Sequence, residues 1–127
     1  MVVTSTYRVL VVEDDADTMA LLRLTLRGMP LEISHAGTGA AAMAFLADHE
    51  PDLVFIDLNL PDMRGWDVVE RLKGNALQQR THIIVLTSHA EPVNRLIGTL
   101  QPLTAYLNKP VQGDQLRAAV REALSLA

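Results

Sequence analysis

The chain has 127 residues, of which 49% are hydrophobic and 20% charged, and its formal net charge is −4. These values are typical of one soluble globular domain with enough apolar residues for a core, and the acidic balance argues against a nucleic-acid-binding face, which is usually basic. Cysteine is absent, which excludes disulfides and thiol catalysis. No apolar run is long enough to cross a bilayer and no signal-peptide pattern opens the chain, so we expect a cytoplasmic protein.

The chain begins with a strand pattern that is followed by a helix pattern. Residues 8–12 (RVLVV) form a short apolar run rich in valine, which is typical of a buried strand. Residues 18–27 carry apolar side chains at helical spacing. Asp15 or Asp17 is available to cap this helix, and Gly28 to end it.

The two patterns then keep alternating. The remaining predicted elements, in chain order, are a strand at 31–35, a helix at 40–47, a strand at 53–56, a helix around 66–72, a strand at 82–86, a helix at 93–100, a strand at 105–107 and a helix at 116–124. Pro102 stops the helix at 93–100, and Asp114 is the expected N-cap of the last helix.

Five strand patterns joined by helix patterns predict an α/β fold. Strands that are apolar throughout are typical of a parallel sheet covered by helices on both faces. Residues 31–35 (LEISH) alternate between apolar and polar, which favours the edge of the sheet. We therefore predict a flavodoxin-like (βα)5 three-layer sandwich with the strand order 2-1-3-4-5, in which ligands bind beyond the carboxyl ends of the strands.

Polar residues follow four of the five predicted strands. They are Glu13, Asp14 and Asp15 after the first strand, Asp57 after the third, Thr87 and Ser88 after the fourth, and Asn108, Lys109 and Pro110 after the fifth. In the predicted order these four strands are neighbours, so their carboxyl ends bring several carboxylates, a hydroxyl and an ammonium into one shallow pocket.

Such a cluster of carboxylates needs a cation or a proton. Two unit charges about 4 Å apart repel by roughly 4 kcal/mol at an effective dielectric constant of ~20, so Glu13, Asp14 and Asp57 together predict a bound divalent ion, for which Mg²⁺ is suited. Lys109 can pair with a carboxylate or hold a phosphoryl oxygen. Asp57, flanked by a metal and a lysine, is then well placed as a nucleophile toward phosphorus.

Each of these groups also has an ordinary interpretation. Taken alone, residues 13–15 are more often a solvated turn with a helix cap, and Thr87 is more often a simple sheet residue. Lys109 before Pro110 is also compatible with a surface lysine at a turn, and Tyr106 is more often half-buried packing than a functional residue. Their positions at neighbouring strand ends favour the metal and phosphate site.

Four short motifs occur in a fixed order: VVED, FIDLNLPDMRGW, IIVLT and YLNKP. On these motifs the chain resembles the receiver domain of bacterial response regulators, and the resemblance implies that residues 1–127 form a single receiver domain. By this resemblance Asp57 is the phosphoacceptor. Glu13 and Asp14 are the acidic pair that binds the metal, with Asp14 expected as the direct ligand, and the backbone carbonyl of Asn59 completes the metal shell.

The same resemblance assigns the residues of a switch. Thr87 resembles the hydroxyl that moves to hydrogen-bond the phosphoryl group, and Lys109 the lysine that contacts that group. Tyr106 resembles the aromatic residue that turns inward when the threonine moves. The peptide bond before Pro110 is expected to be cis.

The chain departs from the common family pattern at a few positions. Glu13 stands where aspartate is frequent, although both residues occur. Pro102 lies where a glycine is usual and Val111 where an aromatic residue is common. Both fall on the surface of the fourth helix, fifth strand and fifth helix, so the family is a weak guide to partners there. His89, like Asn59, lies at a position that tunes how fast relatives lose the phosphoryl group.

The resemblance implies a phosphoacceptor switch of a two-component system that catalyses only its own phosphorylation and dephosphorylation. With Mg²⁺ or Mn²⁺ as cofactor, Asp57 takes a phosphoryl group from a histidine kinase, a phosphotransfer protein or a small phosphodonor. The surface of the fourth helix, fifth strand and fifth helix then binds a downstream protein, an effector domain or a second copy of the chain. Direct contact with nucleic acid or membrane is not expected.

Three other functions compete with this one. A phosphorylation-independent adapter or dimerisation module of the same shape would lack the acidic pair, the acceptor or the lysine. An aspartate-nucleophile phosphatase usually has a second acid two residues after the nucleophile, where this chain has Asn59. A flavodoxin-type mononucleotide binder would have a Gly- or Ser/Thr-rich loop after the first strand, where this chain has acids.

Overall fold

The computed structural model describes residues 6–75, 80–88 and 105–126. The strands are β1 (Tyr7–Val12), β2 (Leu31–Ala36), β3 (Leu53–Asp57), β4 (His82–Thr87) and β5 (Ala105–Asn108). The described helices are α1 (Ala16–Thr25), α2 (Gly39–Asp48), α3 (Gly65–Gly74) and α5 (Gly113–Leu124). The strands form one parallel sheet in the order β2-β1-β3-β4-β5, which confirms the predicted flavodoxin-like α/β class and strand order. The helix predicted at 93–100, Pro102 and His89 lie outside the described residues.

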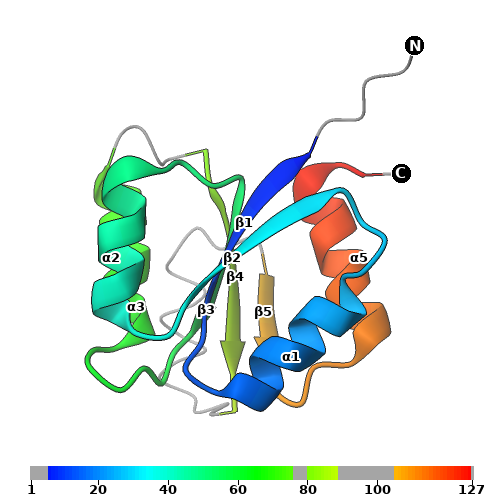
Figure 1. Ribbon diagram of the computed structural model, residues 1–127, viewed down its shortest axis with the longest axis horizontal. Helices are drawn as coiled ribbons and strands as arrows, with labels where there is room; N and C mark the ends of the chain where they lie inside the picture. Colours follow the sequence, from blue (N-terminus) through cyan, green and yellow to red (C-terminus); the bar gives the residue numbers. More distant parts are fainter. Residues whose placement is uncertain (1–5, 76–79, 89–104, 127) are drawn as a thin grey trace.

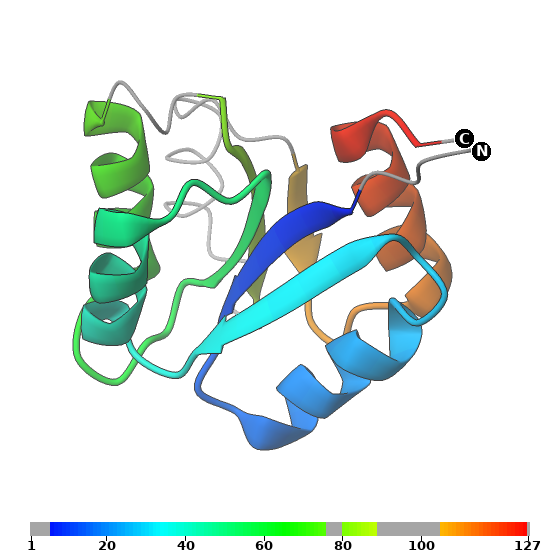
Figure 2. The same ribbon diagram turned by 45° about the horizontal axis from the view of Figure 1, so that its top comes forward.

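Helices cover both faces of the sheet. In Figure 1, α2 and α3 lie against one face and α1 and α5 against the other, and the turned view of Figure 2 shows the same three layers. Because successive side chains of a strand point to opposite faces, β3 contributes Val54 and Ile56 to the α2–α3 side and Leu53 and Phe55 to the α1–α5 side. All four are fully buried. The continuous apolar run of this strand therefore reflects a central position with a core on each side.

The predicted edge strand is confirmed. β2 lies at the end of the sheet order, next to β1. Along it Glu32 and His35 are exposed, while Leu31 and Ile33 are half-buried. β2 accordingly contains a single buried residue, Ala36, whereas every residue of the central strand β3 is buried.

The structure contains one of the two helix N-caps that the sequence predicts, that of the first helix, but not that of the last helix. Of the two candidate caps of α1, Asp15 is the one used, because its carboxylate accepts the backbone N–H of Thr18 at 3.2 Å and the hydroxyl of Thr18 at 2.6 Å. The prediction that Asp114 caps the last helix is wrong. Helical backbone already begins at Gly113, so Gln112 is the cap residue and Asp114 lies in the first turn. A carboxylate there is favourable next to the positive end of the helix dipole.

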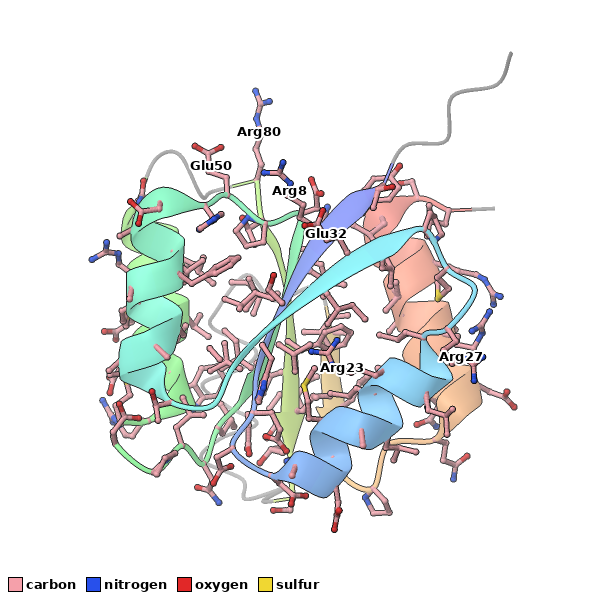
Figure 3. The ribbon with its side chains drawn as sticks, in the orientation of Figure 1. Arg8, Arg23, Arg27, Glu32, Glu50 and Arg80 are labelled. Carbon is pink, nitrogen blue, oxygen red and sulfur yellow. The ribbon has the colours of Figure 1, made fainter. Side chains whose placement is uncertain are left out.

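The winding of the chain reverses between β1 and β3. β1 leads into α1 on one face, whereas β3 leads into α3 on the other, and ligands of such sheets bind where the winding reverses. At the opposite edge, near the amino ends of the strands, the charged side chains of Arg8, Glu32, Glu50 and Arg80 gather and point outward (Figure 3). Within the described ranges, no helix is long and apolar enough to cross a membrane.

Candidate functional site

Asp57 is the last residue of β3, and only 5% of its surface is exposed. Its Oδ1 accepts the backbone N–H of Asn59 at 3.0 Å, and its Oδ2 accepts a hydrogen bond from Nζ of Lys109 at 3.1 Å. The strand is thus one residue longer than the predicted 53–56. A carboxylate can end so apolar a strand because a lysine and a backbone N–H replace its contacts with water.

Two acids at the end of β1 lie beside Asp57. Glu13 is fully buried and Asp14 is exposed. One carboxylate oxygen from each of Glu13, Asp14 and Asp57 lies within 4.8 Å of the others. Among the described residues, Oε2 of Glu13 has no hydrogen-bond partner although it is buried, and such an atom costs free energy. This set of oxygen donors with one unsatisfied member fits a hard divalent cation such as Mg²⁺.

Lys109 brings a positive charge to these acids from the segment after β5. Its ammonium forms ion pairs with both Glu13 and Asp57. Its backbone N–H donates to the carbonyl of Thr87 at 2.8 Å, which ties this segment to the end of β4. The peptide bond between Lys109 and Pro110 is cis, as predicted.

The charges of the pocket shift the pKa values of two groups. The pKa of Glu13 is raised to about 7, first by burial and then by the neighbouring carboxyl group of Asp57, while Lys109 acts in the opposite direction. Burial alone would lower the pKa of Lys109, but its contacts with the two carboxylates outweigh burial and raise it. The lysine is therefore charged at neutral pH, while Glu13 holds its proton more tightly than an ordinary glutamate.

Thr87 and Tyr106, the two predicted switch residues, lie on β4 and β5. Thr87 is the last residue of β4 and is fully buried. The register between β3 and β4 pairs Asp57 with Leu86, so Thr87 lies one residue beyond the acceptor on the neighbouring strand. Tyr106 is half-buried and packs against the core on the α2–α3 side. The geometry thus places Thr87 next to the acceptor strand and Tyr106 in a packing position.

The segment after Asp57 is a closed loop, which the sequence analysis did not anticipate. Asn59 and Arg64 pair across its base, and the backbone N–H of Gly65 donates to the carbonyl of Leu58 at 3.0 Å. A Cβ at Gly65 would lie 2.4 Å from the carbonyl oxygen of Asp57. Glycine therefore lets α3 begin in close contact with the acceptor strand. The glycine in PDMRG was the sequence signal for this approach.

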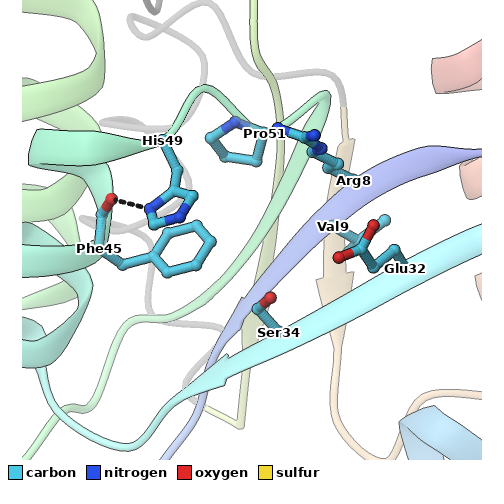
Figure 4. A pocket seen from close by; sticks show the side chains of 7 residues that line it. All are labelled: Arg8, Val9, Glu32, Ser34, Phe45, His49 and Pro51. Atoms are coloured by element: carbon cyan, nitrogen blue, oxygen red, sulfur yellow. Dashed lines mark hydrogen bonds between the residues drawn. The ribbon is translucent and has the colours of Figure 1, made fainter.

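A separate hollow of about 230 Å³ lies at the opposite, amino-terminal edge of the sheet (Figure 4). Arg8 and Glu32 contribute one charge of each sign to its lining, and the rings of Phe45 and His49 stack beside them. Nδ1 of His49 hydrogen-bonds the carbonyl of Phe45 at 3.0 Å, so the imidazole is tied to its own helix. Both charged side chains are exposed, unlike the buried acids at the carboxyl edge.

The sequence pattern of the response regulator receiver domain matches residues 9–121. The chain belongs to this family. Receiver domains of two-component response regulators are phosphoacceptor signalling modules, and the acidic cluster described above lies where the four motifs of this receiver domain converge.

Curated relatives of this receiver domain include longer proteins. The DNA-binding response regulator MtrA of Mycobacterium tuberculosis is 34% identical over 121 residues, which cover 95% of this chain and 52% of MtrA. The chain spans about half the length of the MtrA proteins it matches. Because MtrA is described as DNA-binding, the expectation that this receiver domain has no nucleic-acid partner is without support.

Solved structures of receiver domains share the fold. A CheY-like receiver domain protein from Methanospirillum hungatei has a TM-score of 0.87 at 26% sequence identity, with 95% of each chain covered. The Mn²⁺-bound form of the response regulator Rcp1 has a TM-score of 0.80 at 27% identity, with 94% of each chain covered. The receiver fold of this chain is therefore shown by its own topology and by these similarities.

Proposed function

We propose that this receiver domain is a metal-dependent phosphoacceptor switch that carries the phosphoryl group on Asp57. The observation that carries the proposal is the convergence of Glu13, Asp14 and Asp57 within 4.8 Å, together with a lysine ammonium 3.1 Å from Asp57. A buried aspartate with an acidic pair and a lysine beside it has the groups that phosphoryl transfer to a carboxylate requires.

The residues that would hold the ion are Glu13, Asp14, Asp57 and, through its backbone carbonyl, Asn59. When bound, Mg²⁺ or Mn²⁺ supplies positive charge that stabilises the phosphoryl oxygens during transfer. The donor set supports this assignment because it consists of oxygens and includes the unsatisfied Oε2 of Glu13. The Mn²⁺-bound relative Rcp1 lends further support. Asp14 is exposed, so the site is open to a phosphodonor from solvent.

In the proposed transfer, the carboxylate of Asp57 receives the phosphoryl group directly from the donor. An oxygen of Asp57 forms a bond to phosphorus while the bond from phosphorus to the donor breaks, and the donor leaves with that electron pair. Where the donor is a phosphohistidine, its imidazole takes up a proton from solvent. Lys109 keeps its charge and holds a phosphoryl oxygen, so that positioning and electrostatics supply most of the rate enhancement. The chain catalyses this transfer and the later hydrolysis on itself and turns over no other substrate.

Apolar surface next to the site supports a protein as phosphodonor, such as a histidine kinase or a phosphotransfer protein. On α1, Leu21 and Leu24 are 46% and 61% exposed. An apolar hollow of about 260 Å³ between α1 and the segment after β5 is lined by Leu21, Val111 and Lys109, among others. A donor that covers this surface would bring its phosphoryl group close to the lysine. The same chemistry also accepts a small phosphodonor from solvent.

The proposed signal is a shift between two states of the domain. The phosphoryl group attracts the hydroxyl of Thr87, and Tyr106 turns inward into the space that the threonine leaves. A surface that includes β5 and α5 then changes its affinity for a downstream protein, an effector domain or a second copy of the chain. The burial of Thr87 at the strand end next to Asp57 supports this coupling. The proposed setting is the cytoplasm, with which a chain without cysteine is compatible.

The test is incubation with a small phosphodonor and Mg²⁺, followed by measurement of the intact mass. We expect the mass to increase by one phosphoryl group in the wild-type protein, and no increase in Asp57→Asn or in the wild-type protein with a metal chelator. An increase that survives Asp57→Asn, or no increase in the wild type, would overturn the proposal.

A further inference from the structure

Asp62 lies in the loop between β3 and α3, and its carboxylate binds the first turn of α2. Its Oδ1 accepts the backbone N–H of Gly39 at 2.8 Å, and its Oδ2 accepts that of Ala40 at 2.9 Å. The two hydrogen bonds hold the pKa of Asp62 below its usual range. The hydroxyl of Thr38 caps the next N–H, that of Ala41, and α2 has no acid in its own first turn. A distant part of the chain therefore supplies the carboxylate that this helix end favours.

The neighbouring residue packs against the same turn. A Cβ at Gly39 would lie 2.3 Å from Cγ and Sδ of Met63, so the absence of a side chain at position 39 leaves the space that the methionine fills. Gly39 is buried, and Met63 packs against the core on the α2–α3 side. One polar and one apolar side chain of the loop thus hold it against α2.

The base of the same loop contacts the phosphoacceptor. Asn59 pairs with Arg64 across the base, and its backbone N–H donates to Oδ1 of Asp57 at 3.0 Å. Asn59 is also the residue whose carbonyl would complete the metal site. The loop therefore runs from the acceptor at its base to the first turn of α2, and only two residues separate Asn59 from Asp62 in the sequence.

We propose that Asp62 is a positioning residue for the metal site. By holding the loop on α2, it fixes the backbone of Asn59 in the orientation that binding of the ion requires. Asp62 acts through Asn59 and not by contact with the ion or the acceptor. The inference rests on the proposed function, because it concerns the same site. Groups that orient metal ligands from outside the ligand shell typically contribute about tenfold or more to metal affinity.

The test compares Asp62→Ala and Asp62→Asn with Thr38→Ala as the matched control. Thr38→Ala removes a hydrogen bond from the same helix end but leaves both hydrogen bonds between Asp62 and α2 in place. Each protein is titrated with MgCl2 alone, and the dissociation constant is read from the NMR shifts of the backbone amides. We expect about tenfold weaker binding in Asp62→Ala, a smaller loss in Asp62→Asn, whose amide oxygen can still accept one N–H, and wild-type affinity in Thr38→Ala.

The outcomes separate this inference from the proposed function. Wild-type affinity in both Asp62 variants overturns the positioning role while leaving the metal site intact. Equally weakened Mg²⁺ binding in Thr38→Ala also overturns the positioning role, because the loss of affinity would then arise from the disturbed helix end and not from the loop. Absence of Mg²⁺ binding by the wild type would contradict the proposed function itself. Asp62→Asn nearly preserves the size and shape of the side chain, so the comparison stands even if Asp62→Ala does not fold.

Discussion

Nζ of Lys109 lies 3.1 Å from Oδ2 of Asp57 and also forms an ion pair with Glu13, so a single ammonium joins the ends of β1 and β3. The lysine side chain is 17% exposed, and the two acids are buried. Removing one partner of such a buried arrangement leaves the remaining charges uncompensated. In the metal-free protein this lysine therefore supplies the charge that makes two buried acids tolerable.

We predict that Lys109→Met lowers the free energy of unfolding of the metal-free protein by about 2 kcal/mol near neutral pH. Mg²⁺ should restore part of this loss, because the ion would then neutralise the same carboxylates. Urea unfolding with and without Mg²⁺ measures both effects. Arg80→Met removes an exposed cation at the far edge of the sheet and serves as control. An equal loss in the control would show that Lys109 has no special role.

The raised pKa of Glu13 predicts how the stability of the metal-free protein depends on pH. Its pKa is about 7 in the folded protein, against an ordinary value of 4.5, so the folded state binds this proton more tightly than the unfolded state. The stabilisation from the proton is complete below pH 4.5 and is lost as the pH rises through 7. Ionised Glu13 then costs on the order of 3 kcal/mol.

Glu13→Gln should therefore lose less stability than the wild type between about pH 5 and pH 7.5. The measurement is urea unfolding with a metal chelator at several pH values across this range. The glutamine keeps the shape of the side chain but does not titrate. Parallel stability curves for the two proteins would mean that Glu13 is ionised throughout and that its pKa is not raised.

The close approach of Gly65 to the acceptor strand predicts that a side chain at this position would clash with that strand. A Cβ there would lie 2.4 Å from the carbonyl oxygen of Asp57 and 2.7 Å from Cα of Leu58, both backbone atoms that cannot move independently. Gly65→Ala should destabilise the protein by about 2 kcal/mol and slow phosphorylation. Gly74→Ala lies at the end of the same helix, where an added Cβ would meet no other described part of the chain within 4 Å beyond its neighbours and its own helix backbone, and it should be neutral or slightly stabilising. Thermal unfolding that leaves the two variants equal would contradict the close approach.

Thr87→Val tests the coupling between the acceptor and the rest of the sheet. Valine has nearly the same shape but no hydroxyl, so Asp57 should still be phosphorylated while the response of Tyr106 is lost. The readout is the shift of the NMR signals of the Tyr106 ring when a phosphodonor and Mg²⁺ are added. We expect a shift in the wild type and at most a small shift in the variant. An unchanged shift in Thr87→Val would remove the threonine from the switch.

Much of this site could be predicted because its residues lie at strand ends. The unbroken apolar run of residues 53–56 predicts a central strand, and parallel strands place their carboxyl ends at one edge. Once the order 2-1-3-4-5 is fixed, Glu13, Asp57 and Lys109 must approach one another, whatever the details of the loops. Their chemistry then follows from their residue types.

The features that sequence patterns did not predict depend on contacts between distant segments. Asp62 binds the first turn of α2, and nothing near Asp62 in the sequence indicates that partner. The close approach of Gly65 to Asp57 likewise depends on how α3 leaves the sheet. The cap of α5 was misplaced for a local reason: an acid near the start of a helix is favourable at several positions, and the backbone at Gln112 decides which residue is the cap.

The central claim is that acids from β1 and β3 share one divalent ion at the phosphoacceptor, and a Mg²⁺ titration of the wild type, Asp14→Asn and Asp57→Asn tests it most directly. We predict saturable binding to the wild type in the millimolar range, with the largest amide shifts at residues 13, 14 and 57–59, and a loss of about tenfold or more in affinity in each variant. No saturable binding to the wild type, or equal affinity in all three proteins, would contradict the account.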